Sequence, residues 1–194
     1  MLLSGHLRLD DLITVRRGEL ALHPLAKKPE PVAAEFLKLK GKNGSWCCVF
    51  YDESIRGCSR YRHRPMACGL LDCTDTAPLL AIAGKDLLTR FDCIEDQDPI
   101  LPLVHEYEGC CPCPDLPAIR QHLHSGELPP GQLVELEAAV IRDLGFRGRV
   151  TVGLGLSVAQ ELFYFGRPLF QLLQPLGLQA VNGPGGIRLM IVRR

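Results

Sequence analysis

The chain has 194 residues, of which 46% are hydrophobic, and this length predicts one domain over residues 1–194 with a buried core of its own. Lysine plus arginine and aspartate plus glutamate each number 22, so the formal net charge is zero. A neutral chain has no overall field that attracts polyanions. We therefore expect no nucleic-acid partner and no attraction to an anionic membrane.

The amino-terminal sequence and the cysteines together indicate a cytoplasmic protein. The apolar run at Met1 stops after three residues, which is too short for a signal peptide. No other apolar run approaches the roughly 20 residues that span a bilayer, so we expect no membrane partner. All nine cysteines lie between residues 47 and 113. Disulfides are rare in a reducing compartment and an odd number cannot pair completely, so metal binding or thiol chemistry is the leading expectation.

The first part of the chain predicts a short amphipathic helix within residues 7–22. Its apolar residues stand among charged ones, and Asp10 or Asp11 can begin the helix. Prolines then interrupt the pattern. Residues 41–114 follow as a cysteine-rich core, and their many turn residues predict a loop-rich structure.

Two helices are expected within the cysteine-rich core. One covers residues 78–90, and the other runs from Asp98 towards Tyr107, with Asp98 as its cap and Pro99 in its first turn. Further along, apolar residues recur at helical spacing over residues 130–145 and predict a third helix.

The remaining sequence predicts a strand, two helices and a hairpin. Residues 150–152 are strand-like, Ser157 can cap a helix over residues 158–165, and Arg167-Pro168 can open another that ends near Gly177.

The hairpin consists of strands at residues 178–181 and 187–192 around a glycine-rich turn. We therefore expect an α+β fold, in which a loop-rich cysteine core is joined to helices and a small antiparallel sheet within residues 128–194.

Four cysteines form the main candidate metal site. Cys48, Cys58, Cys68 and Cys73 have the spacing C-x9-C-x9-C-x4-C. Four thiolates suit either a tetrahedral zinc ion or an iron–sulfur cluster, and the absence of C-x2-C here leans slightly towards iron. Cys47 is left out because adjacent side chains of an extended segment point to opposite faces. The alternative is that several of these cysteines are buried and inert.

A second group of cysteines lies further along the chain. Cys111 and Cys113 are each followed by proline, which favours extended backbone and a shared face. They can complete the first site, replace one of its ligands, or form a second site with Cys93 or Cys110. We expect Cys93, which stands alone, to be a packing residue.

Basic residues lie between the candidate ligands. Arg60, Arg62 and Arg64 can stabilise the negative charge of a thiolate site, or of a bound cluster, and raise its redox potential. A solvated basic loop and a local nucleic-acid patch are the alternatives. His63 is expected to be a surface residue.

The cysteine-rich stretch over residues 44–75 resembles the YkgJ-type cysteine-cluster proteins. After Cys48-Val-Phe-Tyr-Asp, this chain matches the family element Cys-x-x-Tyr-x-x-Arg-Pro-x-x-Cys with Cys58, Tyr61, Arg64, Pro65 and Cys68. The resemblance implies chelation of zinc or iron. Many members carry an earlier C-x2-C-x2-C-C motif, and this chain has no cysteine before Cys47, so Cys73 and the group at 110–113 would have to compensate.

The sequence thus favours a protein that binds an iron–sulfur cluster or a zinc or iron ion, in electron transfer, metal handling or a structural role. The family also includes flagellin lysine methylases, so an enzyme that uses the cluster to modify a protein is an alternative, although no methyl-donor motif accompanies it. A third hypothesis is a structural zinc module that contacts a protein partner through its carboxy-terminal helices.

Overall fold

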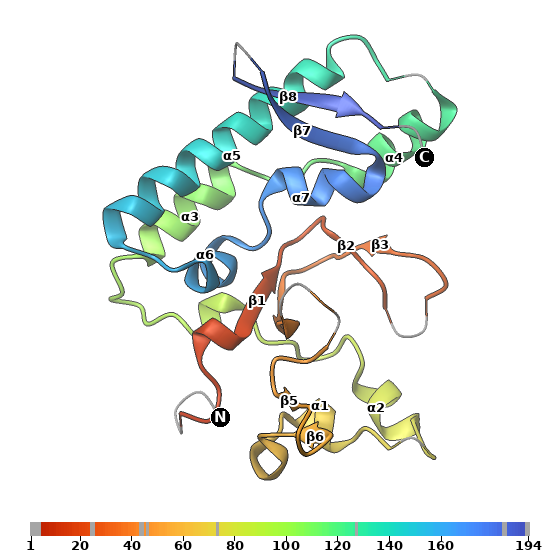
Figure 1. Ribbon diagram of the computed structural model, residues 1–194, viewed down its shortest axis with the longest axis vertical. Coiled ribbons are helices and arrows are strands. Elements are labelled where there is room, and N and C mark those ends of the chain that lie inside the picture. Colours follow the sequence, from red (N-terminus) through yellow and green to blue (C-terminus); the bar gives the residue numbers. More distant parts are fainter. Residues whose placement is uncertain are drawn as a thin grey trace.

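The computed structural model describes residues 5–23, 26–42, 45, 47–72, 74–126, 128–183 and 186–192. Within these residues, seven α-helices combine with small two-stranded antiparallel sheets, which is the expected α+β fold (Figure 1). The helices are α1 Met66–Gly69, α2 Ala77–Ile82, α3 Leu101–Cys110, α4 Leu116–Ser125, α5 Gln132–Leu154, α6 Val158–Phe165 and α7 Leu169–Leu173.

The strands are short and pair mostly with near neighbours in the chain. They are β1 Leu12–Val15, β2 Leu20–Ala21, β3 Glu30–Pro31, β4 Phe36–Leu39, β5 Tyr51–Asp52, β6 Gly57–Cys58, β7 Leu178–Gly183 and β8 Gly186–Ile191. The sheets pair β1 with β4, β2 with β3, β5 with β6, and β7 with β8. Single 3-10 turns include η1 Leu9–Asp11, η3 Tyr61–His63, η4 Arg90–Asp92 and η5 Gln174–Leu176.

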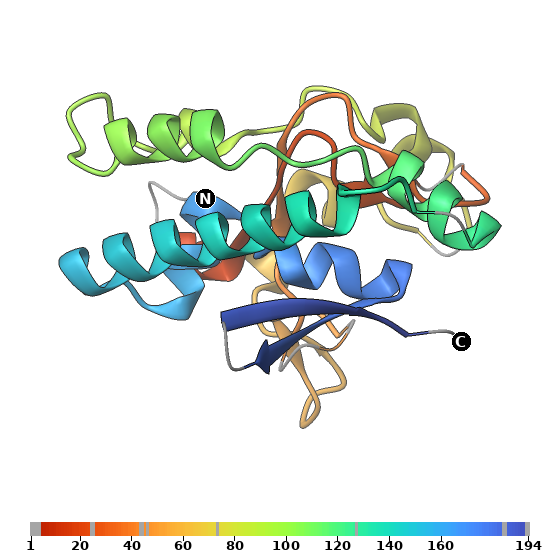
Figure 2. The same ribbon diagram turned by 90° about the horizontal axis from the view of Figure 1, so that it is seen from above.

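The long helix α5 is the central element of the core. It lies between α3 on one side and the β7–β8 hairpin on the other (Figure 2). One half of α5 packs with α3 and α6 in an aromatic cluster that includes Tyr107, Phe146 and Phe165. The other half packs with α4, α7 and the hairpin in an aliphatic cluster that includes Val140 and Leu173. A single helix of 23 residues therefore joins both parts of the core.

The predicted helix over residues 7–22 is wrong, because this segment forms η1, β1 and β2. The run Ile13-Thr14-Val15 is β-branched and favours a strand. It pairs with β4 in a register that places Leu12 opposite Leu39 and Val15 opposite Phe36. The partner strand is distant in sequence, so periodicity within residues 7–22 alone did not reveal the pairing.

Two other predicted elements differ from the structure. The strand at residues 150–152 is wrong, because α5 continues through it to Leu154 and ends at Gly155, whose φ is +62°. Val150 is buried in the aromatic cluster, so packing favours the longer helix. The helix over residues 78–90 is shorter than expected, because the backbone leaves helical geometry before Gly84, whose φ is +75°.

The remaining predicted helices and the hairpin are present in the structure. The start of α3 differs from the prediction, because Ile100 is its N-cap and Asp98 and Pro99 lie before the helix; Asp98 Oδ1 accepts a hydrogen bond from the Ile100 amide there. Ser157 caps α6 through the Gln160 amide, as expected. The β7–β8 hairpin pairs Leu178 with Ile191, and its strands extend into the predicted five-residue turn, to Gly183 on one side and from Gly186 on the other. Part of its predicted turn, residues 184–185, lies outside the described residues. Helix α4 was not predicted.

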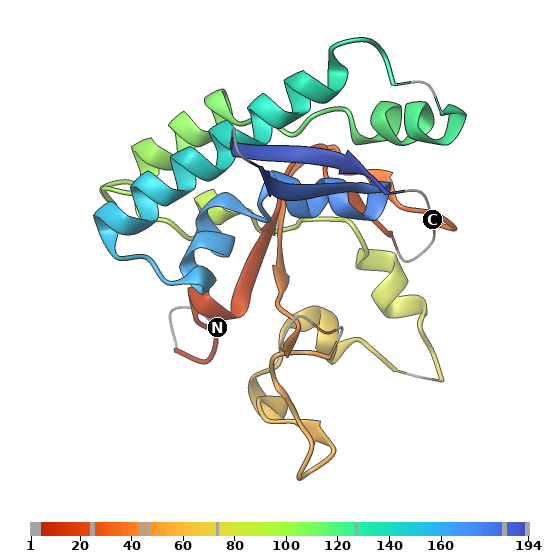
Figure 3. The same cartoon turned by 45° about the horizontal axis from the view of Figure 1, so that its top comes forward.

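Residues 40–88 leave the core as a separate protrusion, here called the cysteine lobe, which carries β5, β6, η3, α1 and α2 (Figures 1 and 3). Its two ends meet at its base, where the Leu37 amide donates to the Leu88 carbonyl at 2.8 Å. Among the described residues at 45 and 47–72, Phe50 is the single buried one. The lobe therefore has little core of its own.

A buried arginine fastens the base of the lobe to the core. The Arg90 Nη2 atom donates to Glu35 at 2.9 Å and to Glu108 at 2.5 Å, and its backbone amide also donates to Glu35 at 3.2 Å. Its Nη1 atom donates to the Tyr164 carbonyl in α6. Arg90 thus connects three parts of the chain: the segment that precedes β4, helix α3 and helix α6.

We expect Arg90→Ala to lower the free energy of unfolding by about 3–5 kcal/mol, because the change removes a fully buried cation and leaves the half-buried carboxylates of Glu35 and Glu108 without it. The matched control is Arg149→Ala. Arg149 pairs with Glu106 at the surface, where the two side chains are 64% and 54% exposed, and its loss should cost less than about 1 kcal/mol. Urea unfolding followed by circular dichroism measures both. Equal losses would contradict a role for Arg90 in holding the core together.

Candidate metal centre

The lobe brings together two cysteines that are ten positions apart. Cys48 pairs with Gly41 in an isolated antiparallel bridge, and its carbonyl accepts a hydrogen bond from the Tyr51 amide in a turn that leads into β5. Cys58 lies in β6 directly opposite Tyr51. The Ser59 amide donates to the Phe50 carbonyl at 2.8 Å and extends this pairing. The hairpin therefore returns Cys58 to the vicinity of Cys48.

Cys68 joins these two from the short helix α1. Burial raises the pKa of the Cys68 thiol, and the Cys48 and Cys58 thiols raise it further, while Arg64 lowers it. Thiolates that hinder one another's ionisation lie within electrostatic reach. The structure thus places Cys48, Cys58 and Cys68 in one electrostatic neighbourhood. Cys48 and Cys68 are exposed and Cys58 is half-buried.

The fourth predicted ligand, Cys73, lies outside the described residues. In the part of the chain that the structure describes, no three histidine, cysteine, aspartate or glutamate side chains are arranged to hold a metal ion. The three thiols are therefore neighbours without the convergent geometry of a formed metal site.

The three candidate arginines have different surroundings. The Arg64 guanidinium lies 4.1 Å from the centre of the Tyr61 ring and is the one whose charge acts on a cysteine, Cys68. Arg60 acts instead on His6, and Arg62 is exposed in the middle of η3.

His63 is exposed, as expected, and it stacks on His6 with ring centres 3.6 Å apart. His6 has a lowered pKa, caused first by desolvation and then by His63 and Arg60. Sequence reasoning missed His6 as a neighbour of the lobe, because no local signal connects it to residue 63.

The second cysteine group lies at a different place in the fold. Cys110 ends α3, and Cys111 and Cys113 follow it in the connection to α4, in the upper part of Figure 1, whereas β5, β6 and α1 lie at the bottom. Figure 3 shows the same separation. This arrangement brings Cys48, Cys58 and Cys68 together and does not bring Cys111 or Cys113 to them. Cys93 packs against the aromatic cluster, as expected of a packing residue.

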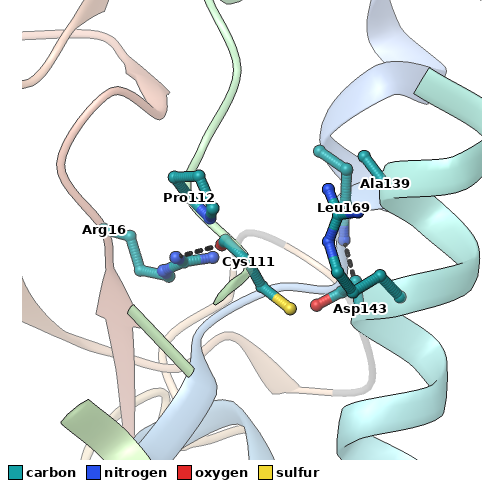
Figure 4. A pocket seen from close by; sticks show the side chains of 7 residues that line it. Arg16, Cys111, Pro112, Ala139, Asp143 and Leu169 are labelled. Carbon is teal, nitrogen blue, oxygen red and sulfur yellow. Dashed lines mark hydrogen bonds between the residues drawn. The ribbon is translucent and has the colours of Figure 1, made fainter. Parts of the chain in front are cut away.

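Cys111 and Cys113 lie against a buried network of charged residues. The Arg16 Nη2 atom donates to the Cys111 carbonyl at 2.6 Å, and Figure 4 shows the Cys111 sulfur directed towards Asp143. The Cys113 Cβ atom lies 3.3 Å from the point that a Cβ atom on Gly18 would occupy. Burial raises the pKa of both thiols to about 12, helped by Cys110 for Cys111 and by Glu19 for Cys113. Both are therefore protonated thiols at neutral pH.

The network itself was not predicted from the sequence. The Tyr107 hydroxyl donates to Asp143 Oδ1 at 2.5 Å and accepts from Arg147 at 2.5 Å and from Arg16 at 3.2 Å. Arg16 also donates to Glu108, at 2.8 Å. A cavity of about 10 Å³, roughly the room of one water molecule, lies beside Cys111 and Asp143 (Figure 4). The charged groups of this network bind one another, which indicates a structural role.

Comparisons of the chain with protein-family models, with curated proteins and with solved structures find no match. The resemblance to YkgJ-type proteins stays a prediction that rests on the motif. None of the described residues belongs to a helix that is both long and apolar enough to cross a membrane.

At pH 8 we expect iodoacetamide to modify Cys48 long before Cys111 and Cys113. A thiol with a pKa of about 12 is ionised in roughly one molecule in 10,000 at pH 8. The thiolate is the reactive form, so the rates at these two cysteines should keep rising as the pH approaches 12. Quenched labelling followed by peptide mass spectrometry measures each site. Protein unfolded in guanidinium is the control, and equal rates in the folded protein would contradict the buried placement.

Proposed function

We propose that this protein binds a zinc or iron ion or an iron–sulfur cluster through Cys48, Cys58, Cys68 and Cys73. The observation that carries the proposal is that Cys48 and Cys58 lie close enough to Cys68 in the lobe to raise the pKa of its thiol. A soft thiolate set is the donor type that these metals take. A bound cation would also remove the mutual repulsion that raises the pKa of Cys68.

The poor packing of the lobe supports the same proposal. A small segment with few buried side chains rarely holds its own structure without a metal, a disulfide or a partner. Among the described residues of the lobe, which form a hairpin and two short helices, Phe50 is the single buried one. Since a metal site in such a segment contributes folding free energy, binding would draw the cysteines into the convergent geometry that the described residues lack.

The basic residues fit the proposal as electrostatic partners. A four-thiolate site carries net negative charge, and Arg64 already acts on Cys68. Arg60 and Arg62 would add to that field from η3, which favours this role over nucleic-acid binding in a chain of zero net charge. Thiolate ligands persist in a reducing compartment, so the proposal includes a cytoplasmic location.

We expect Cys48→Ser, Cys58→Ser, Cys68→Ser and Cys73→Ser each to abolish or greatly weaken metal retention. The matched control is Cys93→Ser, which should keep the metal because Cys93 packs against the core away from the lobe. The measurement is elemental analysis of anaerobically purified protein, with its absorption spectrum, because an iron–sulfur protein is brown and a zinc protein is colourless.

The double variant Cys111→Ser, Cys113→Ser tests whether these two cysteines are ligands of the same metal. We expect it to keep the lobe metal. If it loses all metal while Cys73→Ser retains it, the four-ligand assignment is wrong.

We also expect removal of the metal by a chelator to increase hydrogen exchange across residues 47–72 while the amides of α5 stay protected. The lobe depends on the metal in this proposal, whereas α5 is held by the buried core. Hydrogen exchange with mass spectrometry resolves the two regions. Unchanged exchange in the lobe after complete metal loss would exclude a structural role for the metal.

A further inference from the structure

Cys110 and Cys111 form a close pair of thiols outside the proposed metal centre. Their sulfur atoms lie 3.5 Å apart, at the point where α3 ends. Cys110 is half-buried and Cys111 is 7% exposed. Two adjacent cysteines in a chain do not by themselves place their sulfurs side by side, because each side chain has its own rotamers. The contact is therefore a product of the local fold.

Backbone contacts hold this pair in place. The Arg142 Nε atom donates to the Cys110 carbonyl at 2.9 Å, and Arg16 donates to the Cys111 carbonyl at 2.6 Å. The Cys111 amide donates to the Tyr107 carbonyl at 2.8 Å and closes the last turn of α3. All three contacts fix the backbone on both sides of the peptide bond that joins the two cysteines.

We propose that Cys110 and Cys111 are a reversible oxidation site that hydrogen peroxide converts into a disulfide between adjacent residues. In the first step the Cys110 sulfur attacks a peroxide oxygen, the O–O bond breaks, and Cys110 sulfenic acid and water form. In the second step the Cys111 thiol attacks the Cys110 sulfur, the S–O bond breaks, and the disulfide and a second water form. One peroxide is thus reduced to two waters while two thiols are oxidised.

The order of the two steps follows from the surroundings of each sulfur. Cys111 is buried, and burial together with Cys110 raises its pKa to about 12, so it is a poor first nucleophile. Cys110 is the more accessible of the two. Once Cys110 is oxidised, the neighbouring Cys111 sulfur is already within 3.5 Å and can capture it before a second peroxide arrives.

Ring strain makes the disulfide easy to reduce. Adjacent Cα atoms are about 3.8 Å apart, which is shorter than the roughly 4.4–6.8 Å that an unstrained disulfide prefers. Strained disulfides have higher reduction potentials and are readily opened by thiols. The arginine contacts to both carbonyls oppose backbone adjustment, so they add to this strain.

The test treats the full-length protein with one equivalent of hydrogen peroxide and then alkylates the remaining thiols. We expect the peptide that contains residues 110–113 to carry one alkyl group in place of three, and to be two hydrogen atoms lighter than the same singly alkylated peptide with two free thiols. Dithiothreitol should restore three alkylated cysteines.

Single replacements locate the bond. Cys110→Ser and Cys111→Ser should each prevent it, whereas the matched control Cys113→Ser should still form it. Loss of the bond in Cys113→Ser, or sulfinic acid on Cys110 with a free Cys111 thiol in the wild type, would overturn the proposal. Full alkylation of residues 110 and 111 after peroxide has oxidised other cysteines would also overturn it. Because the site does not use the lobe, these outcomes do not depend on the proposed metal function.

Discussion

The ion pair between Arg147 and Asp143 is the interaction on which the core depends. Both side chains are 2% exposed, and Arg147 Nε lies 2.8 Å from Asp143 Oδ1, one turn apart on α5. Burial of two charges costs several kcal/mol per ion unless every polar atom finds a partner. Arg147 therefore also donates to the carbonyls of Phe165 and Gly166, and Asp143 accepts the Leu169 amide. These contacts fix how the chain passes from α6 to α7 across α5.

The same network reaches the base of the lobe through a series of shared partners. Tyr107 bridges Arg147 to Arg16, Arg16 pairs with Glu108, and Glu108 pairs with Arg90. Burial raises the pKa of Glu35 while Arg90 lowers it, whereas Arg16 and Arg90 hold the pKa of Glu108 below its usual value despite burial. Buried charged side chains, joined to one another by hydrogen bonds, thus run through the core. At the base of the lobe, Arg90 connects this network to the segment before β4, and further contacts, such as the stacking of His6 on His63, also join the lobe to the rest of the protein.

The two cysteine groups differ in chemistry because their surroundings differ. The lobe thiols are exposed or half-buried and lie among basic residues, where a thiolate and a metal are accessible. Cys111 and Cys113 are next to carboxylates in the core and stay protonated. The accessible thiols of the lobe suit metal binding. The thiols of Cys110 and Cys111, which the fold holds side by side, suit a reaction with each other. A count of nine cysteines does not reveal this division, which appears once the chain is folded.

The sequence by itself determined the elements whose signals are local. Ser157 and its Gln160 partner cap α6 within four residues, and a glycine-rich turn between two apolar runs specifies the hairpin. The α+β class and the cysteine spacing follow from equally short patterns. Tertiary structure decided what depends on distant partners. Thr14 is buried in β1 because β4 and α6 cover it, and α5 runs past Gly145 and Gly148 because Phe146 and Val150 are packed in the core. Arginines 16, 90 and 147 look solvated in the sequence, yet they are buried because carboxylates from other elements meet them, and no local pattern records such pairings.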